Sequence, residues 1–161
     1  TTLSLTERLG ALAADLTERD VPRYLAGELR PVPQPAGASI VRQLAKADGA
    51  IDWTQSADAI ERHVRAMWPW PRAWTQSGET VVQIHRASVT DVVSLAPGEV
   101  GRVGNVLAIG TGSSALIVDV AQLPGGKPIS GSALLNNPTI QAIGVFEPAE
   151  PPDVPFIRPA D

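Results

Sequence analysis

Residues 65–71 read Arg-Ala-Met-Trp-Pro-Trp-Pro, and this run decides where a helix must end. Proline has no backbone N–H and its ring clashes with the preceding helical turn, so Pro69 and Pro71 exclude a continuing helix. All four tryptophans of the chain lie in positions 53–74. The run therefore predicts a helix that ends among clustered aromatic side chains.

A helix is predicted over residues 56–67, directly before these prolines. Ser56 is a suitable N-cap, and Asp58 favours the positive end of the helix dipole. One apolar face recurs at helical spacing through Ile60, Val64 and Met67. We expect this face to pack on a core.

After residue 72 the apolar pattern changes from helical spacing to alternation, which is typical of strands. Strands are predicted over 81–87, 100–103, 105–109 and 115–122. A hairpin turn is expected at 110–114 and a short helix over 130–135. Short strands with glycine turns and few helices predict a mainly β, α+β fold, built as a small barrel rather than a doubly wound sheet.

The N-terminal part is predicted to be helical. A helix is expected over 4–19, capped by Ser4 or Thr6, with an apolar stripe of Leu5, Leu9, Leu12, Ala13 and Leu16. Pro22 is expected to start a second short helix in which Tyr24 and Leu25 pack inward and which ends at Gly27. Such helices must pack on another surface, because one apolar face cannot bury itself.

Composition shifts predict the organisation of the chain. Three prolines within residues 31–35 favour an extended linker. We expect a helical segment over 1–30, a linker over 31–50, a barrel domain over 51–145 and an acidic, proline-rich, irregular tail over 146–161. The first residue is threonine rather than methionine, so the chain is expected to be a piece of a longer protein.

Charge and cysteine content exclude several classes of protein. The net charge of −4 argues against a strongly basic nucleic-acid binder, and residues 31–145 carry eight basic and eight acidic groups. Without cysteine there is no disulfide, thiolate nucleophile or sulfur-ligated zinc. No apolar run is long enough for a membrane span, and residues 1–5 lack the basic and apolar regions that we expect of a signal peptide. We expect a cytoplasmic protein.

No motif in the sequence predicts an active site or a metal site. The histidines, His63 and His85, have no paired ligand spacing, and we expect both to be surface or hydrogen-bonded residues. Gly110-Thr111-Gly112 lies between strands, so it is expected to be a hairpin turn rather than a phosphate loop. Asp52 and Asp58 are isolated and predict no carboxylate pair.

The tryptophan cluster has two interpretations. Trp68, Trp70 or Trp74 could stack on nucleobases, as aromatic side chains do in single-strand binders, or they could pack the helix against the barrel. Arg65 is expected to bridge the helix and the barrel backbone. Scattered basic residues could form a diffuse phosphate-contacting face or plain solvated surface, and they are Arg42, Lys46, Arg62, Arg72, Arg86, Arg102 and Lys127.

These residues together resemble the C-terminal domain of methionyl-tRNA formyltransferases. The similarity is carried by residues 48–53 (Asp-Gly-Ala-Ile-Asp-Trp), Ser56-Ala57, Ile60, Arg65-Ala66, Pro69-Trp70-Pro71 and Ala73, and then by the strand 81–87, Pro97-Gly98, 108–112, 122–128 and Leu134-Leu135. It runs through nearly all of residues 1–137. Asp52, Trp53, Arg65, Pro69, Trp70 and Pro71 form its structural motif.

The resemblance implies an open barrel of the OB type that helps to hold initiator tRNA. The family transfers a formyl group from 10-formyltetrahydrofolate to methionyl initiator tRNA in translation initiation, using an Asn-His-Asp set in an N-terminal catalytic domain. That region would lie upstream of Thr1, so no catalytic residue is carried over and the chain alone is expected to be inactive, without a cofactor of its own. Residues 1–30 resemble the last helices of the catalytic domain.

The tRNA contacts implied by this role are Arg42, Lys46, Arg72, Arg86 and Lys127. The family strand often begins with lysine where Gln83 stands here. Two other functions remain open: a scaffold in a related formyltransferase that acts on another amine, such as a sugar nucleotide, and a stand-alone non-catalytic module that binds RNA or a partner.

Overall fold

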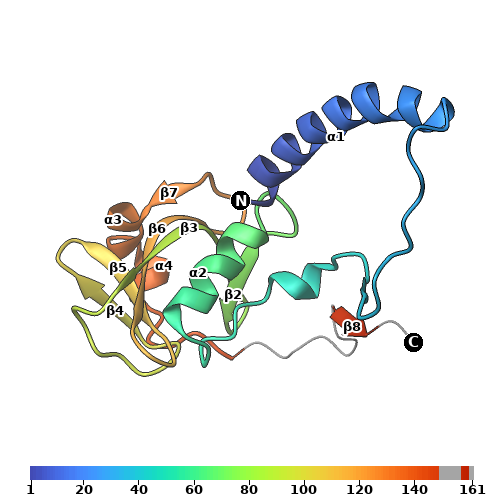
Figure 1. The fold of residues 1–161 in the computed structure, drawn as a ribbon. Coiled ribbons are helices and arrows are strands. Elements are labelled where there is room, and N and C mark those ends of the chain that lie inside the picture. Colours follow the sequence, from blue (N-terminus) through green and yellow to red (C-terminus); the bar gives the residue numbers. More distant parts are fainter. Residues whose placement is uncertain (149–156, 160–161) are drawn as a thin grey trace. The chain divides into compact units, whose positions relative to one another are not determined.

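The computed structural model describes residues 1–148 and the backbone of 157–159 (Figure 1). The chain divides into two compact units. One comprises Thr1–Gln43 with the short strand β8 (Ile157–Pro159), and the other begins at Leu44. Each is described by itself.

The first unit contains one long helix, α1 (Thr2–Leu25), rather than the two predicted helices. Thr1 caps it, and the Thr1 and Ser4 side chains bond reciprocally to each other's backbone. The predicted break at Pro22 is wrong, because α1 continues through Pro22 to Leu25, although proline removes one backbone hydrogen bond there. No residue of α1 is buried, and Tyr24 and Leu25 are exposed rather than packed inward.

The proline-rich segment leads into β1 (Ser39–Val41), which pairs antiparallel with β8. The prediction of an irregular tail is therefore wrong at 157–159, while 149–156 and 160–161 lie outside the described residues. Ile40 is the partner of Arg158 in this ladder. Local patterns did not predict it, because the two strands lie far apart in the sequence.

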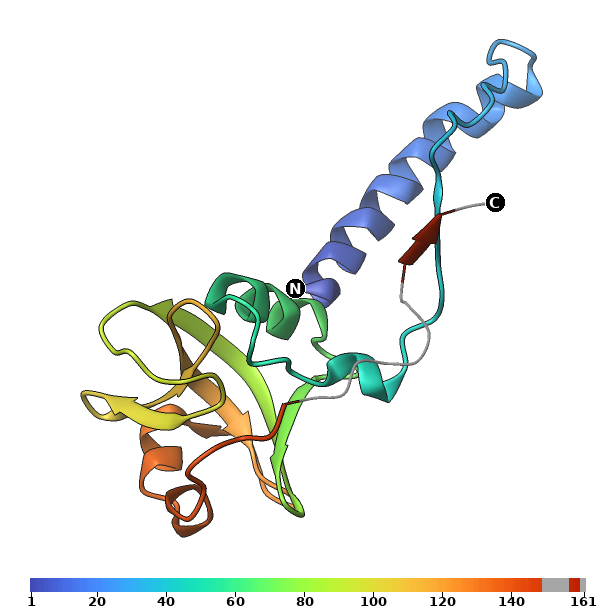
Figure 2. The same ribbon diagram turned by 90° about the horizontal axis from the view of Figure 1, so that it is seen from below.

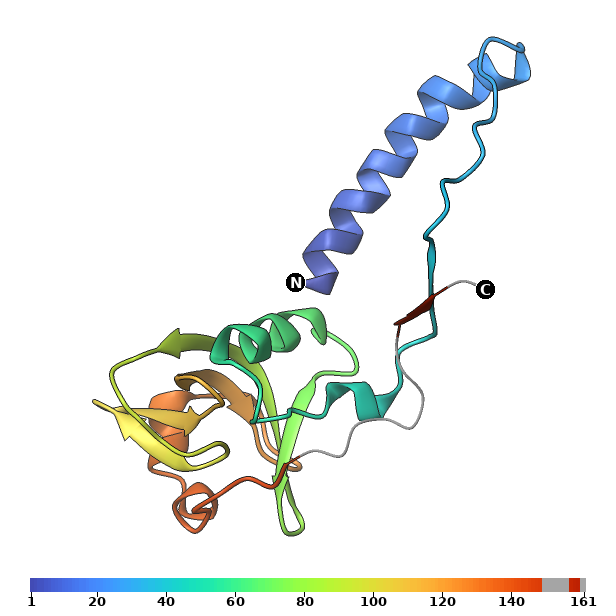
Figure 3. The same cartoon turned by 60° about the horizontal axis from the view of Figure 1, so that its bottom comes forward.

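The second unit is built on an open antiparallel sheet of order β2-β3-β6-β5-β4, with β7 paired to β6. Figures 2 and 3 show this sheet curling round its core, with the β4–β5 and β2–β3 hairpins at opposite ends. The predicted strands are confirmed, and β2 and β7 were missed. Their bounds are β2 (Ala73–Ser77), β3 (Thr80–Thr90), β4 (Val100–Val103), β5 (Val106–Gly110), β6 (Ala115–Gln122) and β7 (Ile129–Ser130).

The predicted central helix is confirmed as α2 (Ala57–Ala66), whose N-cap Ser56 accepts a hydrogen bond from the Ala59 amide at 3.3 Å. Its residues Ile60 and Val64 are buried, as the apolar spacing required. A short 3-10 helix, η1 (Lys46–Gly49), precedes it. The predicted C-terminal helix is confirmed as α3 (Gly131–Leu135), and α4 (Pro138–Gln141) follows.

The core of this unit is organised round Trp53, which is 1% exposed. Its indole stacks on Phe146, with ring centroids 6.3 Å apart. Its Nε1–H donates to the hydroxyl of Thr75, also buried, at 2.9 Å. Phe146 stands at the predicted start of the tail, yet it is 1% exposed, so the chain still contributes to the core there.

Gly49 fixes how closely η1 approaches β2. A methyl group at this position would collide with the carbonyl oxygen of Arg72. Beside it, the Ile51 amide donates to the Trp74 carbonyl at 2.9 Å. Only glycine permits this backbone contact without a shift of one segment.

Thr75→Val is expected to lower the free energy of unfolding by about 1–3 kcal/mol, because the Trp53 N–H would remain buried without an acceptor. Denaturant unfolding of the chain measures this. Thr139→Val, at an exposed position of α4, is the matched control and is expected to change stability by less than about 0.5 kcal/mol. Equal midpoints for the two variants would contradict a stabilising role for the hydrogen bond.

Candidate functional site

The segment that joins α2 to β2 turns the chain sharply. The Arg72 amide donates to the carbonyl of Met67, the C-cap of α2, at 2.8 Å. Both Trp-Pro peptide bonds within the turn are cis. Pro71 is buried, whereas Pro69 and Trp70 are exposed. Arg72 has a φ of 70°, the left-handed region that residues other than glycine rarely adopt.

The Arg72 side chain is held by neutral groups. Its Nη1 donates to Oε1 of Gln83 at 2.9 Å and to Oε1 of Gln122 at 3.4 Å. Its guanidinium carbon lies 5.7 Å from the centre of the Trp68 ring. Among the described residues it has no carboxylate partner, so its positive charge is positioned without being neutralised.

The strand register brings these groups together. Gln83 on β3 is the direct partner of Gln122 on β6, and Trp74 on β2 is the partner of Gln83. Val82 and Ile84 face the core, so Gln83 lies on the opposite face of the sheet. We call Trp68, Arg72, Gln83, His85 and Gln122 the Arg72 cluster.

A bulge follows the cluster on β3. The pairing with β6 shifts register between Ile84 and Arg86 and again between Arg86 and Ala87. Ala87 is buried again, whereas His85 is half-buried and Arg86 is exposed. Since bulges re-aim side chains, this one places both His85 and Arg86 away from the core.

The prediction for the two histidines is confirmed only in part, because both are half-buried, and His63 has hydrogen bonds with the backbone of Gly49 and Ala50. Nε2 of each is buried without a partner. Burial lowers the pKa of His63. Hydrogen bonds with the backbone of Gly49 and Ala50 and the charge of the Asp48 carboxylate raise it, but by less. Burial, and then the nearby Arg72 charge, lower the pKa of His85, whose ring packs 4.9 Å from that of Trp68.

The structure links three of the predicted phosphate contacts. Lys46 lies beside the Arg72 cluster, because its carbonyl accepts from Nε1 of Trp74 at 3.0 Å. Lys127 follows Gly126, whose carbonyl accepts from Nε2 of Gln122 at 2.8 Å. Lys46, Arg86 and Lys127 are exposed, and within the described residues none of them forms an ion pair.

Arg42 and Arg65 lie outside this arrangement. Arg42 belongs to the first unit, where its Nη1 donates to the Gln43 carbonyl at 2.9 Å. The predicted bridge from Arg65 to the barrel is wrong. Its Nε pairs instead with Glu61, one turn earlier in α2, at 2.6 Å, because residues four apart lie on one face of a helix.

Asp52 organises the turn that leads into α2. Its carboxylate accepts from the amide and hydroxyl of Thr54 and from Nε2 of Gln55, at 2.6–3.0 Å. Burial alone would raise the pKa of Asp52, but these hydrogen bonds outweigh it and lower the pKa. Both of its carboxylate oxygens therefore accept hydrogen bonds from its own loop.

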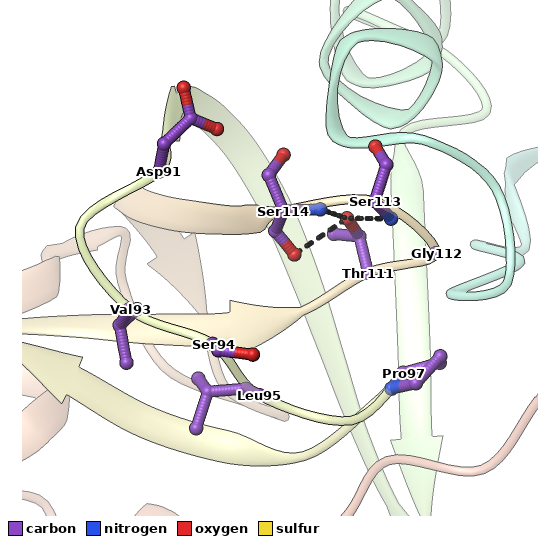
Figure 4. A pocket seen from close by; sticks show the side chains of 9 residues that line it. All are labelled: Asp91, Val93, Ser94, Leu95, Pro97, Thr111, Gly112, Ser113 and Ser114. Carbon is purple, nitrogen blue, oxygen red and sulfur yellow. Dashed lines mark hydrogen bonds between the residues drawn. The ribbon is translucent and has the colours of Figure 1, made fainter.

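A groove of about 410 Å³ lies between the 91–97 loop and the 110–114 hairpin. Figure 4 shows its polar wall of Thr111, Ser113 and Ser114. The Thr111 hydroxyl is used within the hairpin, donating to the Ser114 carbonyl at 2.8 Å and accepting from the Ser114 amide at 3.2 Å. The groove is lined by Asp91 but by no cation, so it is a poor site for phosphate.

Residues 1–148 and 157–159 contain neither a metal-binding group nor a membrane-spanning helix. These residues hold no group of three or more side chains suited to bind a metal ion. Of the helices among them, none is long and apolar enough to cross a membrane.

The histidines predict a pH-dependent stability. Their lowered pKa values mean that the unfolded chain, with histidine pKa about 6.5, binds more protons than the folded chain below neutral pH. The free energy of unfolding should therefore fall as pH is lowered from about 7.5 to about 5.5. The double variant His63→Gln, His85→Gln should show a flatter dependence in denaturant unfolding, and an unchanged slope would contradict this origin.

Comparison with known proteins identifies the family of this chain. The family described as "Formyl transferase, C-terminal domain" matches residues 43–139. Curated relatives named "Methionyl-tRNA formyltransferase" are 40% identical over 135 residues in Chloroflexus aurantiacus and 39% identical over 121 residues in Myxococcus xanthus. These alignments cover 81% and 73% of this chain but 44% and 38% of the relatives. The chain thus spans less than half of their length.

Solved structures agree on the fold. HypX from Aquifex aeolicus superposes with a TM-score of 0.56 at 17% identity, over 83% of this chain and 24% of HypX. A second HypX structure, determined in complex with tetrahydrofolic acid, gives a TM-score of 0.51. The fold and the family match agree over the unit that carries the Arg72 cluster. The chain belongs to the formyl transferase C-terminal domain family.

Proposed function

We propose that this chain is the C-terminal, tRNA-positioning part of a methionyl-tRNA formyltransferase. The observation that carries this proposal is its 33–40% identity, over 102–141 residues, to bacterial relatives that share that name. The reaction of the whole protein would transfer a formyl group from 10-formyltetrahydrofolate to the amino group of methionyl initiator tRNA, in the cytoplasm.

Each part of the whole protein would have its own role in this reaction. Residues 1–30, which contain the single helix α1, would be the last part of the catalytic domain, and 31–50 would be the linker that joins it to the barrel. The formyl donor and the Asn-His-Asp set would belong to the catalytic domain. The barrel would hold the tRNA so that the methionyl amine stays near the donor, which raises the rate by fixing the geometry of the reactants.

The basic side chains support this role. Arg72 donates to Gln122, whose amide donates to the carbonyl of Gly126, the residue before Lys127. The Lys46 carbonyl accepts from Trp74 on β2, and Arg86 lies in the bulge of β3. Lysine and arginine that are not neutralised by carboxylates can exchange bound counterions for phosphates. Arg42, in the first unit, would add a contact from the linker.

The charge balance limits the affinity that this unit supplies. Residues 31–145 are neutral overall, so long-range attraction to RNA is small. On the outer face of the sheet the Asp119 carboxylate accepts from Ser88 at 3.4 Å, near the bulge that carries Arg86. We therefore expect a few local contacts to hold the tRNA, and the catalytic domain to add the rest.

The triple variant Lys46→Gln, Arg86→Gln, Lys127→Gln is expected to bind initiator tRNA more weakly. The slope of log K against log salt should fall by about 0.7–0.9 for each phosphate contact that is lost. Titration of labelled tRNA at several salt concentrations measures both. Arg102→Gln, which removes an exposed charge on β4, is the control and should leave affinity and slope nearly unchanged. If the triple variant and Arg102→Gln changed the affinity and the slope equally, Lys46, Arg86 and Lys127 would not be the phosphate contacts.

The chain alone is expected to form no formyl-methionyl-tRNA when it is mixed with methionyl-tRNA and 10-formyltetrahydrofolate. The reason is that none of the catalytic set can be assigned to its residues. Separation of the product by chromatography, with a full-length relative as the positive control, is the measurement. Product formation by the chain itself would show that a catalytic centre lies within these residues.

A further inference from the structure

Three of the four tryptophans make contacts within the protein. Trp53 is buried in the core and Trp74 donates to the Lys46 carbonyl. Trp68 is packed between the His85 ring and the Arg72 guanidinium. Trp70 is 56% exposed, and among the described residues it makes no hydrogen bond and no ring contact.

The backbone on either side of Trp70 is restrained. Pro69 and Pro71 each have a fixed φ, and the hydrogen bond from the Arg72 amide to the Met67 carbonyl closes the segment onto the end of α2. A large aromatic side chain on a restrained backbone loses little entropy when it binds. An exposed indole in such a place is suited to contact a flat, apolar ligand surface.

Arg72, two positions further on, supplies a fixed positive charge. Its left-handed backbone conformation is unfavourable for a residue with a Cβ. An arginine at this position therefore costs more conformational free energy than a glycine would. Two glutamine oxygens and the Trp68 ring fix the guanidinium without neutralising it. By contrast, Arg19, Arg23 and Arg65 all pair with carboxylates. The Arg72 site is therefore preorganised for an anion.

An aromatic face and a cation this close match the two parts of a nucleotide. The Cα atoms of two residues two positions apart lie at most about 7 Å from each other. Stacking on an aromatic side chain requires a base that is free of its helix, because the bases of an A-form duplex are stacked on one another and its deep groove is closed to side chains. The ligand that fits is therefore an unpaired nucleotide rather than a duplex.

We propose that Trp70 and Arg72 hold one unpaired ribonucleotide of the tRNA, with its base stacked on the Trp70 indole and its phosphate bound by the Arg72 guanidinium. The proposal rests on the proposed function. The nucleotide would come from the single-stranded 3′ end or from a loop of the tRNA, and both offer the same chemistry.

The test compares Trp70→Ala, Trp70→Phe, Arg72→Gly and the unaltered chain in titrations with labelled initiator tRNA at several salt concentrations. Trp70→Ala should weaken binding by about 5- to 100-fold, since one stacked base contributes that much, and should leave the salt slope unchanged. Trp70→Phe keeps an aromatic face and should retain most of the affinity. Arg72→Gly should weaken binding and reduce the slope by about 0.7.

Folding and binding are separable in these variants. Glycine relieves the left-handed backbone at position 72, and Trp70 is exposed, so Trp70→Ala and Arg72→Gly should keep the overall fold. Circular dichroism and denaturant unfolding confirm this before binding is measured. If Trp70→Ala unfolds, Trp70→Leu, which also lacks an aromatic ring, replaces it in the same titration. If Arg72→Gly unfolds, Arg72→Gln replaces it. The expectations for affinity and slope are unchanged.

Three RNAs locate the nucleotide. They are the intact tRNA, the same tRNA without its unpaired 3′ nucleotides, and a blunt-ended RNA duplex. Loss of the Trp70 effect in the shortened tRNA places the base at the 3′ end, and its persistence places the base in a loop; both support the site. An equal Trp70 effect on the duplex overturns it.

Different results would contradict the nucleotide site and the proposed function. Salt-dependent binding of tRNA that is insensitive to Trp70→Ala overturns the nucleotide site and leaves the tRNA-positioning function intact. No binding of tRNA by the unaltered chain at low salt overturns the proposed function, and the site with it.

Discussion

The hydrogen bond from the Arg72 amide to the Met67 carbonyl is the contact on which the arrangement of the second unit depends. It closes the turn that Pro69 and Pro71 impose at the end of α2, and it sets where β2 begins. Because side chains alternate along a strand, that starting point decides which residues face inward. Ala73 and Thr75 enter the core, and Arg72 and Trp74 are left on the other side.

The two faces of the sheet therefore have different roles: one packs into the core, and the other carries the Arg72 cluster. On one face the Trp53 indole donates a hydrogen bond to Thr75 and stacks on Phe146. One buried side chain thus connects three parts of the chain that are distant in sequence. On the other face the Gln83–Gln122 pair receives the Arg72 guanidinium. A slip of β2 by one residue would exchange the faces and destroy both arrangements at once.

Local patterns predicted the elements whose signals are local. Ser56 and the spacing of Ile60 and Val64 were enough for α2, and alternating apolar residues were enough for β3 and β6. β2 was missed because Ala-Trp-Thr-Gln-Ser lacks a run of β-branched residues, and its ladder with β3 supplies what propensity does not. Phe146 was assigned to a tail because only its tertiary contact with Trp53 reveals it as core.

The candidate site was predictable only in part, for a related reason. Arg72 was singled out by its charge, but Gln83 and Gln122 carry no charge, and only the β3–β6 register brings them together. Alternation along β3 does place Gln83 and His85 outward, which was the available signal. The buried, unpaired Nε2 atoms of the two histidines were not predicted, because burial comes from neighbouring segments, which sequence spacing does not show.

The Arg72 cluster also explains how a stretch of chain without net charge can still present an anion site. Residues 31–145 balance eight basic against eight acidic groups, but the balance is not local. The Glu61 carboxylate is paired with Arg65 on α2, whereas Arg72 is held by amide oxygens alone. A lysine at position 83 would place a like charge beside Arg72, whereas Gln83 holds the guanidinium without neutralising it. Net charge governs long-range attraction, but the partners of each cation govern where a phosphate can bind.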